Sequence, residues 1–180
     1  MKEVFTIEQM RPIRDGMTVS RDARLGGKVT FFSLGAGTDI SQECYDTDTL
    51  YLGASGSTSF LVGRPVTPCP LGAGELLLVP GGTLCGMESE AGGIYTEIIT
   101  KKENLIMNQL VKPGEVIRLK DLISYETGSI ANLDVASNEK MKFMLMAFDE
   151  GTGLSPHRAP GNAIVFALEG KAIIQNEGVD

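Results

Sequence analysis

Short apolar runs separated by turn residues dominate the chain. Valine, isoleucine, leucine and aromatic residues gather in runs of about 4–8 residues, and glycine, proline or aspartate follows most of them. The clearest runs are Lys28–Leu34, Thr49–Gly53, Thr58–Gly63, Glu75–Pro80, Ile94–Thr100, Lys142–Phe148, Ala163–Leu168 and Lys171–Gln175. Few amphipathic helical stretches compete with them, so the pattern predicts an all-β sandwich or barrel. The stretch Lys102–Gly114 fits a helical turn or a strand.

One of these runs, Lys142–Phe148, is apolar on both of its faces. Alternation along a strand places Met144, Met146 and Phe148 on one face, and Phe143, Leu145 and Ala147 on the other. We therefore expect a strand that is buried on both sides.

The chain also repeats itself. Lys28–Phe60 aligns without a gap on Lys142–Ile174 at an offset of 114 residues. Glycines 37 and 56, together with Thr38 and Ser41, meet identical residues in this alignment. Upstream, Glu3–Gly16 aligns on Glu115–Gly128 at an offset of 112. The shared strand rhythm and the shared glycines predict two copies of one β unit.

The repeat predicts how the chain divides into domains. We expect an N-terminal barrel over residues 1–100, a linker over residues 101–111 and a partial C-terminal barrel over residues 112–180. Roughly the last third of the repeat unit has no counterpart in the second copy, so the second barrel should be incomplete. Unpaired strand edges pair readily with another chain. We therefore expect a homodimer or a higher oligomer.

Composition narrows the choice of partners and compartment. Lys and Arg number 16 against 23 Asp and Glu, a net charge of −7, which disfavours binding to nucleic acid or to an anionic membrane. The N-terminus has no continuous apolar segment of the signal-peptide type, and no window approaches about 18 apolar residues. The three cysteines form no C-x-x-C pair, which favours a reduced, cytoplasmic setting.

The glycines of both copies are spaced in a frame typical of one family. In the second copy Gly151 precedes His157, the only histidine, by six residues, and Gly170 closes the stretch. The first copy has Gly37 and Gly56 at the equivalent places, followed by Gly74-x5-Pro80-x-Gly82. This frame resembles the cupins, whose motifs are G-x5-H-x-H-x3–4-E-x6-G and G-x5-P-x-G-x2-H-x3-N. The resemblance implies all-β, double-stranded β-helix (jelly-roll, cupin) barrels in tandem, a bicupin with the second barrel incomplete.

The resemblance also implies where ligands would lie, since three histidines and the glutamate of cupins hold one metal ion. In the first copy the positions of the two histidines and the glutamate of the first motif hold Glu43, Tyr45 and Thr49. The second motif has Cys85 in place of its histidine and Ser89 in place of its asparagine. In the second copy His157 keeps the first position, Ala159 takes the second, and Ala163 or Ile164 takes that of the glutamate.

These substitutions lead to three functional hypotheses. The first is a small-molecule-binding protein with no metal cofactor in its N-terminal barrel, because oxygen and sulfur donors without imidazole make an unusual metal site. Its pocket residues would be Glu43, Tyr45, Thr49, Cys85, His157 and Arg158. The second is a metal-dependent enzyme, a dioxygenase, isomerase or lyase acting on a small organic acid or sugar. There a divalent transition metal would bind His157 in a complete C-terminal barrel. The third is a structural or assembly module.

Overall fold

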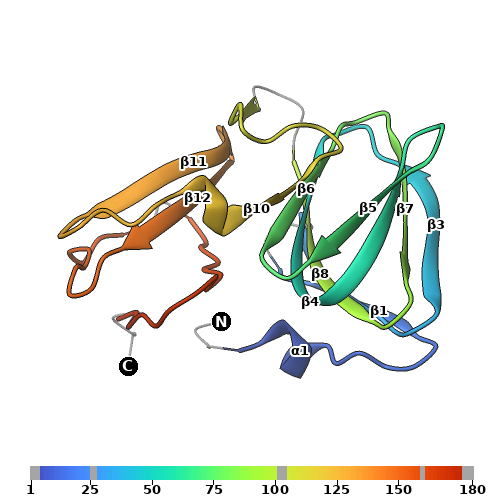
Figure 1. Cartoon of the computed structure of the whole chain (residues 1–180), viewed down its shortest axis with the longest axis horizontal. Helices are drawn as coiled ribbons and strands as arrows, with labels where there is room; N and C mark the ends of the chain where they lie inside the picture. The colour runs from blue at the N-terminus through green and yellow to red at the C-terminus, as the bar shows by residue number, and fades with distance from the viewer. Residues whose placement is uncertain (1–4, 25–27, 101–104, 159–160, 176–180) are drawn as a thin grey trace.

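The computed structural model describes residues 5–24, 28–100, 105–158 and 161–175 of the chain, and its regular structure is almost entirely β. In chain order the elements are α1 (Ile7–Met10), β1 (Thr18–Asp22), β2 (Val29–Leu34), β3 (Thr38–Cys44), β4 (Thr49–Val62), β5 (Thr67–Gly72), β6 (Glu75–Val79), β7 (Leu84–Ser89), β8 (Gly93–Ile99), β9 (Ile106–Met107), β10 (Val116–Arg118), the 3₁₀ helix η1 (Leu119–Leu122), β11 (Ile130–Asn138) and β12 (Met141–Phe148) (Figure 1). The all-β prediction is confirmed. Among the described residues, no helix has the length or the hydropathy needed to cross a membrane.

Strands β1–β8 form an antiparallel barrel in which β4 belongs to two sheets. One sheet runs β1-β2-β8-β4-β6-β10, and the other brings β3 beside β7 and both β5 and β7 beside β4. The first half of β4 pairs with β6 and β8, whereas Ser57–Val62 pairs with β5, and its last four residues also pair with β7. The strand therefore forms the seam between the sheets, as in a jelly roll.

Glycine is required where β4 passes from one sheet to the other. The pairing of β4 with β8 shifts register between Gly53 and Ser55, and Gly56 has a φ of 61°. A Cβ atom on Gly53 would overlap the carbonyl oxygen of Gly72, and one on Gly56 would overlap that of Gly92. The backbones approach here more closely than any side chain allows.

Aromatic rings fill the inside of the barrel. The ring centroid of Tyr51 lies 4.5 Å from that of Phe60 and 5.9 Å from that of Tyr95, and Phe32 stacks on Tyr95 at 5.1 Å. Leu34, Leu71 and Leu77 complete this core, and all three are at most 2% exposed. The inside of the barrel is thus close-packed.

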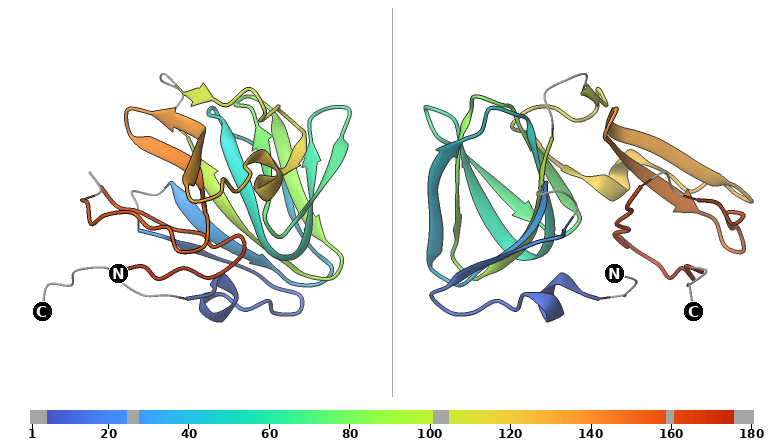
Figure 2. Two further views of the ribbon diagram at one scale, coloured as in Figure 1. Left: turned by 60° about the vertical axis from the view of Figure 1, so that its left-hand side comes forward. Right: turned by 180° about the vertical axis from the view of Figure 1, so that it is seen from behind.

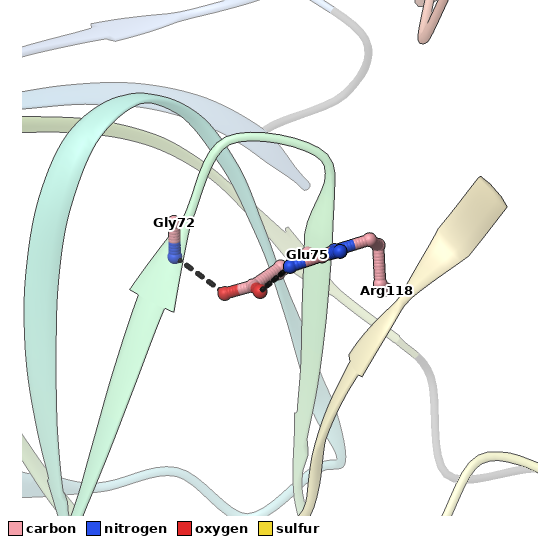
Figure 3. A network of polar contacts seen from close by, with 3 residues as sticks. All are labelled: Gly72, Glu75 and Arg118. Carbon is pink, nitrogen blue, oxygen red and sulfur yellow. Dashed lines mark hydrogen bonds and ion pairs between the residues drawn. The ribbon is translucent and has the colours of Figure 1, made fainter. Parts of the chain in front are cut away.

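The outer faces of β4, β6 and β8 are covered by the rest of the chain. Leu50, Leu76 and Ile98 join a second core with residues of the later strands, among them Val135 and Leu145. β10 extends the barrel sheet by pairing with β6, and it lies between the barrel and the β11–β12 hairpin (Figure 1). Figure 3 shows the accompanying polar link, in which a Glu75 carboxylate oxygen accepts from the Gly72 amide at 2.8 Å and the other lies 3.7 Å from Arg118.

The start of the second copy repeats the start of the first in three dimensions. The helical turn η1 lies 112 residues after α1, and Gly16 and Gly128 have φ values of 66° and 70°. The hairpins also share one register, because Thr18 faces Leu34 as Ile130 faces Phe148. The repeat is structural up to Gly151, whose φ of 77° matches the 69° of Gly37.

Beyond Gly151 the predicted strands are wrong. Residues 163–168 and 171–175 form no strand, although their counterparts lie in β4 (Figure 1). In the barrel β4 pairs with four other strands, whereas no described strand pairs with residues 163–175. Their backbone therefore has no ladder to join.

The expectation that β12 is buried on both faces is wrong, because Met146 and Phe148 are 37% and 38% exposed while Leu145 and Ala147 are buried. The described part of Lys102–Gly114 holds the short strand β9 followed by a turn.

The domain boundaries, including the linker over 101–111, stay predictions, and residues 101–104 lie outside the described residues.

We predict that Gly53→Ala lowers the free energy of unfolding by about 3 kcal/mol, because the new methyl group meets the Gly72 carbonyl in a backbone that has no room to move. Unfolding in guanidinium chloride measures the change. Gly153→Ala is the matched control, because nothing lies within 4 Å of a Cβ there. Equal midpoints for Gly53→Ala and the wild type would contradict the prediction.

Candidate functional site

Glu43 and Tyr45 lie at one end of the barrel, where β3 ends. Glu43 is exposed and Tyr45 is half-buried, and the Tyr45 hydroxyl donates to Glu43 Oε2 at 3.3 Å. The register between β3 and β7 shifts between Ile40 and Glu43, after which Glu43 faces Cys85. The structure therefore brings together three of the predicted pocket residues.

Cys85 and Thr49 are both buried below this mouth. Burial, with a smaller contribution from nearby Cys69, raises the pKa of the Cys85 thiol to about 12, so the thiol stays protonated at neutral pH. The Thr49 hydroxyl is 3.4 Å from the carbonyl oxygen of Thr47, to which it donates. The hydrogen-bonding capacity of the Thr49 hydroxyl as a donor is thus used within its own turn.

A carboxyl group that sequence reasoning missed is buried at this end of the barrel. Glu97, on β8, is 5% exposed and faces Tyr51 on β4. Burial and, to a smaller extent, the charge of Glu43 raise the pKa of Glu97, hydrogen bonding with Tyr51 and Tyr45 lowers it, and together they leave it at about 7. Glu97 is consequently close to half-ionised at neutral pH.

Tyr45 links the two carboxyl groups. Its hydroxyl donates to Glu43, and hydrogen bonding with Tyr45 is also among the causes that lower the pKa of Glu97, yet the phenol carries one proton to donate. Burial raises the pKa of Tyr45 to about 12, with the charges of Glu97 and Glu43 adding to the effect, so this proton is retained. When Glu97 is protonated, it can donate to Tyr45 while Tyr45 donates to Glu43.

Two polar groups at this mouth lack a full set of partners. The Tyr95 hydroxyl is buried and has no hydrogen-bond partner among the described residues, and burial followed by the charge of Glu97 raises its pKa. Tyr95 lies two residues before Glu97 on the same face of β8. None of the ion pairs formed within the described residues includes Glu97. A buried carboxyl group without a cation is unusual unless it serves a site.

The sequence held one signal for Glu97. It is the only charged residue in the run Ile94–Thr100, and it shares the parity of Tyr95 rather than that of Ile94 and Ile98. A lone carboxylate inside an apolar strand is expected on the side that faces a cavity or a mouth. Which side that is depends on the pairing with β4.

His157 and Arg158 are not brought to this mouth. Both are exposed in the strand-free segment after β12, and His157 Nδ1 lies 3.0 Å from the Ser155 carbonyl oxygen. Ala159, the neighbouring ligand position, lies outside the described residues. His157 as a pocket or metal-binding residue and Arg158 as a pocket residue stay predictions.

The described residues do not fit the metal ion implied by the family resemblance. No group of three or more histidine, cysteine or acidic side chains among them could hold one. Among the predicted pocket residues that the structure brings together, Glu43, Tyr45 and Cys85 supply only oxygen and sulfur donors and no imidazole. We therefore derive no metal chemistry from this barrel.

Two surface hollows found among the described residues lie away from Glu97. One, of about 280 Å³, is beside Arg11, Pro12 and Arg14, and the other, of about 380 Å³, follows β3 and β7 from Gly37 to Glu90. Because Tyr51, Phe60 and Tyr95 fill the barrel, a molecule that contacts Glu97 has to be small and held at the rim.

Comparison with solved structures supports the assigned fold. The chain is similar to a cupin 2 conserved barrel domain protein from Leptotrichia buccalis, with a TM-score of 0.72 and 17% identity, over 87% of this chain and 70% of that one. It also resembles a cupin superfamily protein from Desulfitobacterium hafniense (TM-score 0.50, 18% identity, 56% and 94% of the chains). It is also similar to a conserved protein of unknown function from Streptococcus pyogenes, with a TM-score of 0.50 and 18% identity, over 57% of this chain and 90% of that one. No family model and no curated protein matches the sequence.

We predict that Glu97 makes the folded chain less stable as the pH rises from about 4.5 to about 7. The pKa of Glu97 is higher in the folded chain than its ordinary value of 4.5, so the unfolded chain releases this proton first. The contribution of Glu97 to the free energy of unfolding is greatest below pH 4.5 and falls by about 3 kcal/mol through the folded pKa. Glu97→Gln should remove this fall.

Denaturant unfolding of the wild type and of Glu97→Gln at several pH values between about 4 and 8 measures the difference. The variant should match the wild type at the acidic end and exceed its stability at the alkaline end. Glu88→Gln, on an exposed site of β7, is the control and should follow the wild type. A constant difference across the range would show that Glu97 does not titrate as described.

Proposed function

We propose that this chain, which has the cupin fold, binds a small polar molecule at the mouth of its N-terminal barrel through Glu43, Tyr45 and Glu97. The observation that carries the proposal is the buried Glu97 carboxyl, which has no ion-pair partner among the described residues. A carboxyl group there lowers the free energy of unfolding at neutral pH. Such a loss of stability is typical of functional sites, and a purely structural core would gain nothing from it.

The groups at the mouth specify the chemistry of the molecule. Glu43 and Glu97 offer acceptors, Tyr45 and Tyr95 offer phenols, and no basic side chain is paired with either carboxylate among the described residues. Hydroxyl or amine groups on the ligand would donate to the carboxylates and satisfy the Tyr95 hydroxyl. The filled interior limits the ligand to a few heavy atoms.

We predict that ethanolamine, as a probe carrying one hydroxyl and one amine, shifts the NMR amide signals of Glu43, Tyr45 and Glu97 saturably. Tyr45→Phe should weaken this binding about tenfold, the equivalent of one hydrogen bond. Tyr125→Phe is the control, because the Tyr125 hydroxyl contacts Glu169 at 3.0 Å on another part of the chain. Equal binding by wild type and Tyr45→Phe, or no saturable shift at these residues, would contradict the proposal.

A second candidate function is assembly, with a second copy of the chain as the partner. In the barrel β2 pairs on one edge with β1 and on the other with β8, whereas its counterpart β12 pairs with β11 alone among the described strands. The face of β12 that carries the exposed Met146 and Phe148 borders this open edge. Identical edge strands related by a twofold axis pair antiparallel, which would cover both edges at once.

We predict that the chain is a dimer at micromolar concentration by light scattering coupled to size-exclusion chromatography. Replacing both Met146 and Phe148 with lysine should yield a monomer, because charged side chains oppose edge pairing. Met17→Lys is the control, since Met17 is 50% exposed but lies before β1. A monomeric wild type would exclude this assembly.

A further inference from the structure

The end of the barrel opposite to Glu97 carries a hollow bordered by two arginines. Its lining consists of Arg11, Pro12, Arg14, Val19 and Ser20, and its volume is about 280 Å³. The segment that holds these arginines runs from α1 to β1 along one end of the barrel (Figures 1 and 2). It packs on β2 at Ser33, three residues beyond Thr30, which faces Glu97. Thr30 and Ser33 are thus about 10 Å apart along the strand.

Backbone contacts hold both arginines in place. The Arg11 carbonyl oxygen accepts from the fully buried Ser33 hydroxyl at 2.5 Å, and the Arg11 amide donates to the Ile7 carbonyl at 2.7 Å. Arg14 forms a β-bridge with Met17, and a Cβ atom on Gly35 would overlap the Arg14 carbonyl oxygen. The bases of the two side chains are therefore fixed before any ligand arrives, which lowers the entropy lost on binding.

The charges of these arginines are not neutralised by the chain. None of the ion pairs among the described residues includes Arg11 or Arg14, although the chain carries seven more acidic than basic residues. The Nε atom of Arg11 is buried and donates to nothing in the described part of the chain. A buried guanidinium donor without an acceptor is costly, so the position calls for an acceptor from outside the chain.

The repeat shows that the fold does not need these arginines. At the offset of 112 residues Arg11 corresponds to Ile123 and Arg14 to Glu126. The second copy nevertheless forms the helical turn, the Gly128 turn and a hairpin in the same register. If the local fold required arginine at these positions, both copies would carry it. Only the first copy does, so the fold does not require it.

We propose that this hollow binds a small organic oxyanion, a molecule that presents a carboxylate or phosphate group to Arg11 and Arg14. Guanidinium groups match the planar or tetrahedral oxygens of such anions with paired hydrogen bonds. The exposed Ser20 hydroxyl supplies a further donor, and Pro12 and Val19 supply an apolar wall for the rest of the molecule. The site is independent of the one proposed at the barrel mouth.

NMR detection of the arginine Nε–H signals tests the proposal, with inorganic phosphate and acetate as the two probes. The Arg11 signal should shift saturably, with a dissociation constant of about 1 mM or below for at least one probe. Arg11→Gln and Arg14→Gln should each weaken binding about tenfold, read from backbone amides of Val19 and Ser20. Arg64→Gln, an exposed arginine in the turn after β4, should bind as the wild type does.

A second variant separates binding from folding. Arg11→Ile combined with Arg14→Glu installs the residues of the second copy, so it should keep the wild-type amide spectrum elsewhere and lose binding. A preference for phosphate or for acetate identifies the anionic group. The proposal is overturned if neither probe shifts Arg11 saturably, or if the double variant binds as tightly as the wild type. Loss of ethanolamine binding at the barrel mouth would leave this result untouched.

Discussion

Burial of β4, β6 and β8 on both faces is the constraint on which the rest of the structure depends. Tyr51 and Leu77 point into the barrel while their neighbours Leu50 and Leu76 pack against the later strands. Because side chains alternate along a strand, a slip by one residue would exchange the two sets and move Glu97 from the mouth into the second core. One register therefore determines both apolar cores and the position of the carboxyl group.

This double burial also explains which elements were predictable. Runs such as Leu76–Val79 are continuously apolar because both sides are covered, and they stand out in the sequence. Strands β1 and β3 have one solvated face and read as polar segments, so they were not among the predicted runs. The resemblance to the cupin motifs, which rests on the glycine frame, is what assigned Glu43, Tyr45 and Cys85 to ligand positions. The placement of Glu97 needed the pairing of β8 with β4, which is a non-local property.

The two copies show how far local sequence can specify structure. The helical turn, the left-handed glycine and the hairpin recur in the second copy with matching register, because each is formed by residues close in the chain. Residues 163–168 are as apolar as the start of β4 yet form no strand. A central strand exists only when its neighbours complete the ladder, so the apolar run is necessary but not sufficient.

The polar groups at the two ends of the barrel do not stabilise the fold, unlike the glycines and apolar residues that form it. Glu97 has a raised pKa because burial opposes its charge, and Arg11 keeps a buried donor without a partner in the described chain. Neither feature stabilises the barrel, and the arginine positions hold Ile123 and Glu126 in the repeat without loss of the local fold. Turn glycines and a doubly buried register therefore maintain the architecture, while the side chains at its ends can differ between the copies without loss of the local fold.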